Sequence, residues 1–266
     1  VTTAGDLRFG LALDAPPTGW RLADPALAGP FMARLLEADA VRLEVEAGDA
    51  GWLRAGALPL VEAAPLTIAV THRAQPATPE RLVYHPPVLA LGVGAERGAA
   101  VEALAGLADS VLAEAGLAPA AVACVVSLDL KAAEPAVHAL AERLGVPARF
   151  LPAERLLAET GRLSVRSEPV FRETGCWGVA EGAALAAAGP EGRLLVPKRK
   201  GQGVTAAVAL AGQGLDPGAI GRPQGELAVV GLGPGGPAWR TAEAEERLAG
   251  AEDLVGYGLY LDLIGP

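Results

Sequence analysis

One part of this sequence alternates short apolar runs with longer helical stretches, and this alternation constrains the fold more than any other feature. In chain order, the runs and stretches occupy residues 88–93, 99–115, 122–126 and 135–144. A strand, helix, strand, helix order is typical of a parallel sheet with covering helices. One more helix and two strands follow at residues 179–187, 194–198 and 204–210. We therefore predict a complete α/β domain with a largely parallel sheet over residues 88–211.

Residues 1–75 look like a truncated central region of another unit. The opening residues, 1–6, read as the tail of a strand that runs into a loop. Asp24 followed by Pro25 predicts the start of a helix, because aspartate is a favoured N-cap and proline fits the first helical position. The apolar stripe of that helix would comprise Phe31, Met32, Leu35 and Leu36. Four prolines then stiffen residues 76–87, which we predict to be an extended linker.

A second linker and a further truncated unit follow the α/β domain. Residues 212–225 are rich in glycine and proline and hold few large apolar side chains. Beyond them we predict a strand at 227–230, a loop at 231–237 and a helix capped by Thr241. Residues 226–266 are too few to close a sheet alone. The predicted fold is an α/β domain flanked by two incomplete domains.

The charge of the chain argues against several kinds of partner. The formal net charge is −9, and no run of Lys or Arg concentrates positive charge. Nucleic acids and anionic membranes bind concentrated positive surfaces, so we expect neither as a partner. No apolar stretch approaches the roughly 20 residues that cross a bilayer, and we expect no signal peptide. Two cysteines are too few for a disulfide framework, and we predict a cytoplasmic protein.

Metal and nucleophile signals are weak. The three histidines, His72, His85 and His138, lie far apart, and none is spaced with another ligand as a zinc pair would be. We therefore predict no metal site. The sequence also lacks the Gly-x-Ser-x-Gly elbow of common serine hydrolases.

Two glycines after the first strand of the α/β domain are candidate ligand contacts. Gly92 and Gly94 precede a helix with Arg97 near its start, and helix N-termini favour anions. A tight turn between strand and helix explains the glycines equally well. The next acid at a strand end, Asp129, comes 35 residues after Gly94, whereas a dinucleotide fingerprint places it about 20 residues on.

Polar residues also follow the second strand, where open α/β sheets bind ligands. Ser127, Asp129, Lys131 and Glu134 lie there. Only three of the 22 basic residues are lysines, so a lysine at this edge suggests a need for a compact, titratable charge. The alternative interpretation is that Lys131 is a solvated lysine beside Glu134.

The densest basic cluster is Lys198-Arg199-Lys200, at the end of a predicted strand. A ligand with several carboxylates would need such a patch against the net negative field of the protein. Thr205, on the next strand, is a further candidate contact, and a solvated hairpin is the alternative. Glu181 opens a nearby helix of very small residues, which permits close packing or close approach of a ligand.

The loop after residue 230 looks like a phosphate loop, with Gly231, Gly233, Pro234 and Gly235. Pro234 and Pro237 each remove a backbone donor that phosphate binding would use. This loop therefore disfavours dinucleotide binding.

Four segments of the α/β domain resemble the carboxyl-terminal domain of CbiG and the single-domain CobE, two proteins of cobalamin biosynthesis. They are PPVLALGVGAERG, SLDLKAAEPAV, GCWGVAEGAAL and LVPKRKGQGVTAAVAL. Before them, TTAGDLRFGLALDAPPTGWRLADP resembles the middle of CbiG, whose amino-terminal domain we expect to be absent. After them, residues 225–264 are similar to the opening of the precorrin-3B C17-methyltransferase family, CobJ or CbiH. The order of the matches indicates a fusion of neighbouring pathway steps.

The resemblance implies two activities for such a fusion. CbiG-type proteins open a lactone on cobalt-precorrin-5A and release a two-carbon aldehyde, and the methyltransferase adds a methyl group at C17. The implied substrate is a precorrin or cobalt-precorrin. S-adenosylmethionine would be held by a complete methyltransferase domain through Gly231, Gly233, Pro234 and Gly235, and that domain would allow a homodimer. We expect no cofactor in residues 88–211.

Lactone hydrolysis needs a base that activates water and a group that stabilises the developing oxyanion. Glu134 and Glu181 are the candidate bases, and Lys131 is the candidate cation. The candidate substrate contacts are Gly92, Gly94, Arg97, Ser127, Asp129, Lys198, Lys200 and Thr205. Two alternatives stay open: a non-catalytic module that binds or hands over a tetrapyrrole, and a nicotinamide-dependent reductase that uses Gly92, Gly94 and Asp129.

Overall fold

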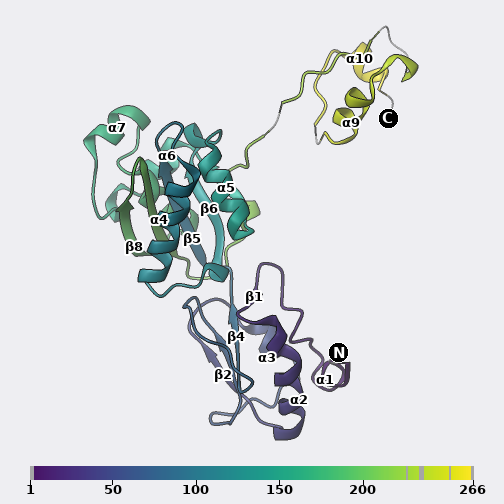
Figure 1. Ribbon diagram of the computed structural model, residues 1–266, viewed down its shortest axis with the longest axis vertical. Helices are drawn as coiled ribbons and strands as arrows, with labels where there is room; N and C mark the ends of the chain where they lie inside the picture. Colours follow the sequence, from purple (N-terminus) through teal and green to yellow (C-terminus); the bar gives the residue numbers. More distant parts are fainter. Residues whose placement is uncertain (1–2, 226, 234–236, 252, 265–266) are drawn as a thin grey trace. The chain divides into compact units, whose positions relative to one another are not determined.

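The computed structural model of the chain describes residues 3–225, 227–233, 237–251 and 253–264. Its contacts divide the chain into two compact units, Val1–Gln224 and Gly225–Pro266. The first unit contains two β-sheets, and Figure 1 shows helices packed beside each of them.

The first sheet has four strands in the order β1-β4-β3-β2. These strands are β1 (Arg21–Leu22), β2 (Arg42–Val45), β3 (Thr67–Val70) and β4 (Arg81–His85). Strands β2, β3 and β4 are parallel, and β1 runs antiparallel to β4. Three helices share one hydrophobic core with this sheet: α1 (Thr3–Phe9), α2 (Ala28–Ala38) and α3 (Gly51–Ala55).

The predicted start of the helix near residue 25 is confirmed. The carboxylate of Asp24 accepts a hydrogen bond from the amide of Ala26, and a short 3-10 helix, Pro25–Leu27, leads into α2. The predicted apolar stripe packs into the core, with Phe31, Met32 and Leu35 buried and Leu36 partly buried.

The strand tail and loop predicted for residues 1–6 are wrong at residues 3–6, and residues 1 and 2 lie outside the described part of the chain. Residues 3–6 belong to helix α1, whose last residue, Phe9, is buried in the same core as α2. The helix forms because the first sheet offers an apolar surface that the sequence of this short segment does not reveal.

The linker predicted at residues 76–87 is also wrong, because β4 lies inside it. Leu82 and Tyr84 of β4 are buried in the core of the first sheet, and the hydroxyl of Tyr84 donates to the carbonyl of Leu13. The four prolines lie outside the strand, two before it and two after it. They mark the limits of the strand, where missing amide donors cost nothing.

The second sheet confirms the α/β class. Its order is β7-β6-β5-β9-β8, made of β5 (Leu89–Ala95), β6 (Val122–Leu128), β7 (Ala148–Leu151), β8 (Arg193–Lys200) and β9 (Val204–Leu210). Strands β5, β6 and β7 are parallel. Strand β9 is antiparallel to both of its neighbours, β5 and β8, and a tight turn joins it to β8. The sheet is therefore mixed, and the parallel pattern holds for three of its strands.

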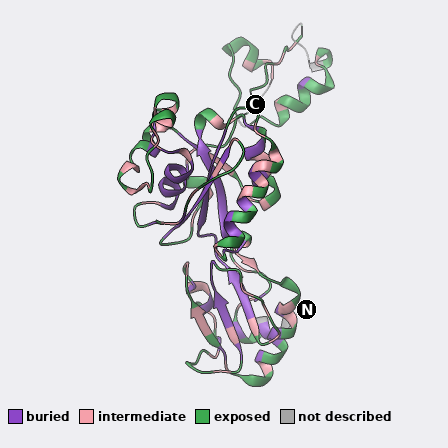
Figure 2. Ribbon diagram, turned by 60° about the vertical axis from the view of Figure 1, so that its left-hand side comes forward, coloured by how far each residue is buried: buried purple, intermediate pink, exposed green. Residues whose placement is uncertain are grey.

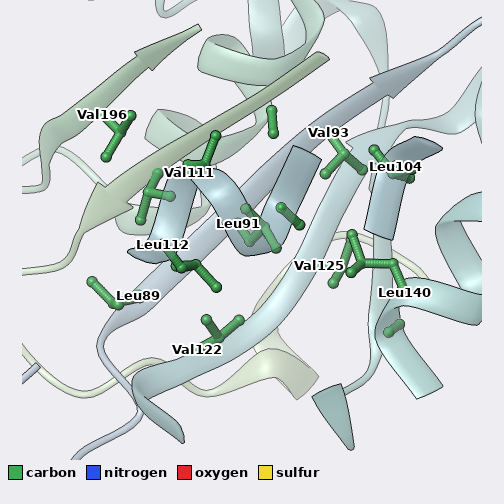
Figure 3. Close-up of a cluster of buried hydrophobic side chains, with 14 of the residues drawn as sticks. Leu89, Leu91, Val93, Leu104, Val111, Leu112, Val122, Val125, Leu140 and Val196 are labelled. Carbon is green, nitrogen blue, oxygen red and sulfur yellow. The ribbon is translucent and has the colours of Figure 1, made fainter. Parts of the chain in front are cut away.

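Helices cover both faces of the second sheet. Helices α4 (Val101–Glu114) and α5 (Pro135–Leu144) bury apolar side chains against one face, and Figure 3 shows leucines and valines of this core. Helix α8 (Val179–Ala188) lies on the other face, and its residues 180–188 are all buried. Strands β5, β6 and β9 are buried almost throughout, and Figure 2 shows purple strands between the helices.

The small residues of α8 let it lie directly on β5. A Cβ atom on Gly92 would come within 2.0 Å of the carbonyl oxygen of Ala180 and 2.6 Å of the amide nitrogen of Ala184. Only glycine allows so close an approach.

Part of the glycine- and proline-rich segment at 212–225, around residues 220–222, packs against the second sheet instead of forming a free linker. The backbones of Phe150 and Arg222 exchange two hydrogen bonds of 2.8 and 2.9 Å. The guanidinium of Arg149 donates to the carbonyls of Ile220 and Gly221. The segment follows the edge of β7 because these polar groups find partners there.

The second unit contains the helices α9 (Ala242–Ala249) and α10 (Gly258–Asp262). The predicted cap of the first is confirmed, since the hydroxyl of Thr241 accepts from the amide of Ala244 at 3.2 Å. The strand predicted at 227–230 is absent from these described residues, and Leu227 and Val229 are almost fully exposed. Among the described residues, no helix has the length and apolarity needed to cross a membrane.

Candidate functional site

The lysine-bearing end of β8 lies at the same edge as the carboxyl ends of β5 and β6. Lys200 pairs with Thr205 across β8 and β9, and Thr205 pairs with Gly94 across β9 and β5. Gly94 precedes the last residue of β5. Lys198 and Lys200 therefore share this edge with the loops after β5 and β6. It is the edge at which open α/β sheets bind ligands.

Glycine at position 94 makes room for Thr205. A Cβ atom on Gly94 would lie 2.6 Å from the Thr205 hydroxyl oxygen and 3.6 Å from the side chain of Val179. Val179 is the first residue of α8. The start of α8, Thr205 and the end of β8 therefore lie close together on one side of the sheet.

Strand β8 is irregular where it carries the basic cluster. Its register with β9 shifts between Val196 and Arg199, and the Lys198 amide donates to the carboxylate of Glu181 at 2.7 Å. Arg199 lies 3.9 Å from Glu114 of α4. Lys198 is half-buried and Lys200 is exposed, and neither ammonium forms an ion pair with a carboxylate that the structure describes.

Glu181 is buried and engaged on both of its oxygens. It receives the amide of Ser164 at 2.8 Å, the hydroxyl of Ser164 at 2.5 Å and the amide of Lys198. Only 2% of the residue is exposed. All three donors are neutral, and the first turn of α8 adds a favourable helix dipole for the carboxylate. A catalytic base must reach its substrate, so the prediction of Glu181 as a base conflicts with this burial.

A second polar group lies in the loops after β5 and β6. The carboxylate of Glu134 accepts the amide of Gly98 at 3.0 Å and lies 3.9 Å from the ammonium of Lys131. Both side chains are largely buried, 11% exposed for Glu134 and 22% for Lys131. The arrangement joins a cation and a carboxylate at the carboxyl edge of the sheet.

The side chain of Ser127, near the end of β6, makes a contact within the sheet. Its side chain is fully buried, and its hydroxyl donates to the carbonyl of Val93 at 2.8 Å. The hydroxyl links β6 to β5 and does not face a ligand, which corrects the prediction of a substrate contact. Asp129 and Arg97 are exposed at the same edge and stay predicted contacts.

The two cysteines are unpaired and buried. Burial raises the pKa of the Cys124 thiol to about 12. This thiol is therefore protonated at neutral pH and is a poor nucleophile.

Comparisons with known proteins decide the family. The family model described as Cobalamin synthesis G C-terminus matches residues 89–209. Protein CobE of Sinorhizobium sp is 50% identical over 121 residues, which cover 46% of this chain and 79% of that protein. The chain belongs to the CbiG/CobE family.

Two other relatives match different shares of the chain. A cobalt-precorrin-5A hydrolase of Priestia megaterium is 26% identical over 232 residues, covering 79% of this chain and 61% of that protein. Cobalamin biosynthesis protein CobIJ of Mycobacterium bovis is 52% identical over 40 residues, 15% of this chain and 8% of that protein. The chain thus spans less than two thirds of both of these relatives.

In this CbiG/CobE chain, Gly92 and Gly94 do not form a nucleotide loop. Gly92 and Gly94 both lie inside β5, with α8 over the first and Thr205 over the second. A phosphate loop needs free backbone amides in a turn between strand and helix. The placement disfavours the reductase alternative and corrects the prediction of a substrate contact at Gly92.

The candidate cofactor residues lie in the second unit. Gly231 and Gly233 are exposed, and Pro234 and Gly235 lie outside the described residues. Among the residues that the structure describes, no group of three or more His, Cys, Asp or Glu side chains is placed to hold a metal ion.

Sequence reasoning missed the segment between β7 and α8. It supplies Ser164, which binds Glu181, and a stacked pair formed by Phe171 and Trp177. The scarcity of aromatic residues, 4% of the chain, was a signal that could have drawn attention to this pair.

Proposed function

We infer that this chain acts in cobalamin biosynthesis and binds a precorrin or cobalt-precorrin at the carboxyl edge of the second sheet, as a hydrolase-like CbiG/CobE protein. The single observation that carries the proposal is the pair of unpaired ammonium groups, Lys198 and Lys200, at the ligand-binding edge of a protein with a net charge of −9. A tetrapyrrole precursor carries several carboxylates, so its binding needs local positive charge that offsets the net negative charge of the protein.

The proposed chemistry is hydrolysis of a lactone on the ring. Glu134 is the candidate that remains for the base, because both oxygens of Glu181 accept hydrogen bonds and only 2% of that residue is exposed, whereas Glu134 is 9% exposed and accepts one hydrogen bond from the described residues. Lys131 would stabilise the developing negative charge. Arg97, Asp129 and Thr205 are the proposed additional contacts at the same edge.

A non-catalytic binding or handover module is the second candidate. The observation in its favour is that Glu134 already holds the Gly98 amide and lies beside Lys131, which lowers the reactivity expected of a free base. An assay for release of a two-carbon aldehyde from cobalt-precorrin-5A by the purified chain distinguishes the two candidates, because release would favour the hydrolase. Binding without release would favour the handover module.

The lysine pair gives the direct test of binding. Replacing Lys198 and Lys200 with alanine should weaken binding of uroporphyrin III, a tetrapyrrole with acetate and propionate side chains, by at least about tenfold. Each charged hydrogen bond to a carboxylate contributes roughly 1.5–3 kcal/mol before screening, and 1.4 kcal/mol is a factor of ten. The loss should shrink as salt is raised. Calorimetric titration measures the affinity.

Arg199 supplies the matched control. It lies between the two lysines, but its guanidinium is near Glu114 of α4, so Arg199→Ala should weaken binding much less than the double lysine substitution does. Equal affinity of wild type and a folded Lys198→Ala, Lys200→Ala variant at low salt would contradict the proposed site.

The second unit is proposed to be the opening of a precorrin-3B C17-methyltransferase domain. The 40-residue match to CobIJ supports the proposal. Several large apolar side chains are exposed in this unit, as expected where further chain would pack: Leu227, Val229, Val255 and Tyr257. The described residues of the unit do not fit S-adenosylmethionine, because residues 227–230 form no strand that could be a wall of its cleft.

We therefore expect no S-adenosylmethionine binding by this chain. Gly231 and Gly233 are exposed and stand in no sheet that the structure describes, so the cofactor would gain few contacts. Calorimetry with the cofactor at micromolar concentrations should give no heat of binding. Transfer of a methyl group to a precorrin by this chain alone would refute the expectation.

A further inference from the structure

The segment between β7 and α8 has a packed part and a projecting part. It holds α6 (Ala153–Leu157), the 3-10 helix Thr160–Arg162 and α7 (Glu168–Thr174). Leu156 is buried, and Arg162 donates to the carbonyls of Gly189 and Gly192. Helix α7 has no buried residue, and Figure 1 shows it standing clear of the strands.

Residues 165–177, which we call the α7 segment, close on themselves. The amide of Ser167 donates to the carbonyl of Trp177 at 2.9 Å. The rings of Phe171 and Trp177 stack with centroids 4.3 Å apart and planes 16° from parallel. Both side chains are half-buried, so the pair presents an aromatic surface on a segment otherwise rich in charged residues.

One buried carboxylate fastens the base of the α7 segment to the lysine edge. Glu181 accepts both donors of Ser164, at the base of the segment, and the amide of Lys198 in β8. At the other end of the segment, Trp177 lies two residues before Val179, which faces the Gly94 and Thr205 position. The aromatic pair and the lysines are therefore held at one end of the same helix.

We propose that the α7 segment is the ring-binding half of the tetrapyrrole site. The aromatic pair, Trp177 with Phe171, takes the flat face of the macrocycle, while Lys198 and Lys200 take its carboxylates. A flat conjugated ring stacks on an aromatic surface, and its acidic edge needs cations beside that surface. The inference rests on the proposed function. Glu181 is a positioning residue in this site, because it holds both halves and touches no ligand.

Titration of the full chain with uroporphyrin III tests the aromatic half. Trp177→Ala should weaken binding about tenfold, by loss of ring stacking and of buried apolar surface. Trp177→Phe keeps an aromatic face and should recover most of the affinity. Trp239→Ala is the matched control, because Trp239 is exposed in the other unit, and its affinity should equal that of wild type.

A second probe separates ring binding from carboxylate binding. Butane-1,2,3,4-tetracarboxylate carries four carboxylates and no ring, so it should bind more weakly than uroporphyrin III. Its affinity should be lower for the double lysine variant than for wild type and unchanged for Trp177→Ala. Phe171→Ala, on a helix without buried residues, gives an independent variant if Trp177→Ala fails to fold. A smaller loss of uroporphyrin affinity is expected, because Phe171 is the supporting ring of the pair.

The outcomes distinguish this inference from the proposed function. If uroporphyrin III binds Trp177→Ala and Phe171→Ala as tightly as wild type while the lysine variant is weakened, the aromatic half is refuted and the carboxylate site stands. If neither the aromatic nor the lysine variants lose affinity, both proposals are refuted.

Discussion

Gly92→Ala should lower the free energy of unfolding by about 3 kcal/mol. The added methyl group would lie 2.0 Å from the Ala180 carbonyl oxygen and 2.8 Å from the Ala184 side chain, so α8 would have to move off β5. Overpacking of a tight core costs about 1–3 kcal/mol, and here the nearest obstacle is backbone, which places the effect at the upper end. Urea denaturation followed by circular dichroism measures the change.

Gly106→Ala is the matched control. Gly106 lies in the middle of α4, and a Cβ atom there would meet nothing within 4 Å. Alanine in a helix interior is favoured over glycine by about 0.8–1.0 kcal/mol, so this variant should be slightly more stable. A Gly92→Ala protein within about 1 kcal/mol of wild type, a loss typical of ordinary substitutions, would show that α8 does not rest on β5 as described.

The elements of the second sheet were predictable because their signals are local. Apolar runs and helical periodicity gave β9 and α5 with their observed limits, and β5, β6 and α4 to within a few residues. The direction of β9 was not predictable in this way, because a strand pattern does not reveal which neighbour it joins. Strand β4 was missed because the prolines around it dominated the local pattern.

The lysine edge was predictable for a different reason. Lysine is rare in this chain, and strand direction places the end of β8 at the carboxyl edge. The roles of the buried polar residues were not predictable. Whether Glu181 faces solvent or the amide of Lys198 depends on the irregular register of β8, which appears only when the strands and α8 are packed together.

His72 is another buried polar residue whose surroundings could not be predicted from the sequence, and its burial affects stability. Its side chain is 1% exposed, and neither ring nitrogen has a hydrogen-bond partner among the groups that the structure describes. Burial lowers the pKa of His72, Glu46 opposes that shift, and Arg73, Arg193 and His85 add to it. The folded chain therefore keeps this imidazole neutral at a cost, since two buried polar atoms are unsatisfied.

His72→Leu should raise the free energy of unfolding by about 2 kcal/mol at pH 7.5, because a buried unsatisfied polar group costs about 1–3 kcal/mol. The pKa of His72 is lower in the folded than in the unfolded chain, so the unfolded chain binds more protons. The free energy of unfolding of wild type is therefore highest above the ordinary histidine pKa of 6.5, and it decreases as the pH drops below that value. The advantage of the leucine variant should grow between pH 7 and 5.5, as urea denaturation at each pH would measure.

His85→Leu is the control, because it matches His72 in burial but differs in bonding. Burial lowers the pKa of His85 as well, but its Nδ1 donates to the carbonyl of Thr71 at 2.8 Å. Removing that donor leaves a buried carbonyl unpaired, so this variant should lose about 1 kcal/mol at pH 7.5. At pH 7.5 we therefore expect His72→Leu to raise the free energy of unfolding and His85→Leu to lower it. A His72→Leu protein less stable than wild type at that pH would mean that the imidazole has a stabilising partner, and the buried histidine would then contribute to the fold instead of opposing it.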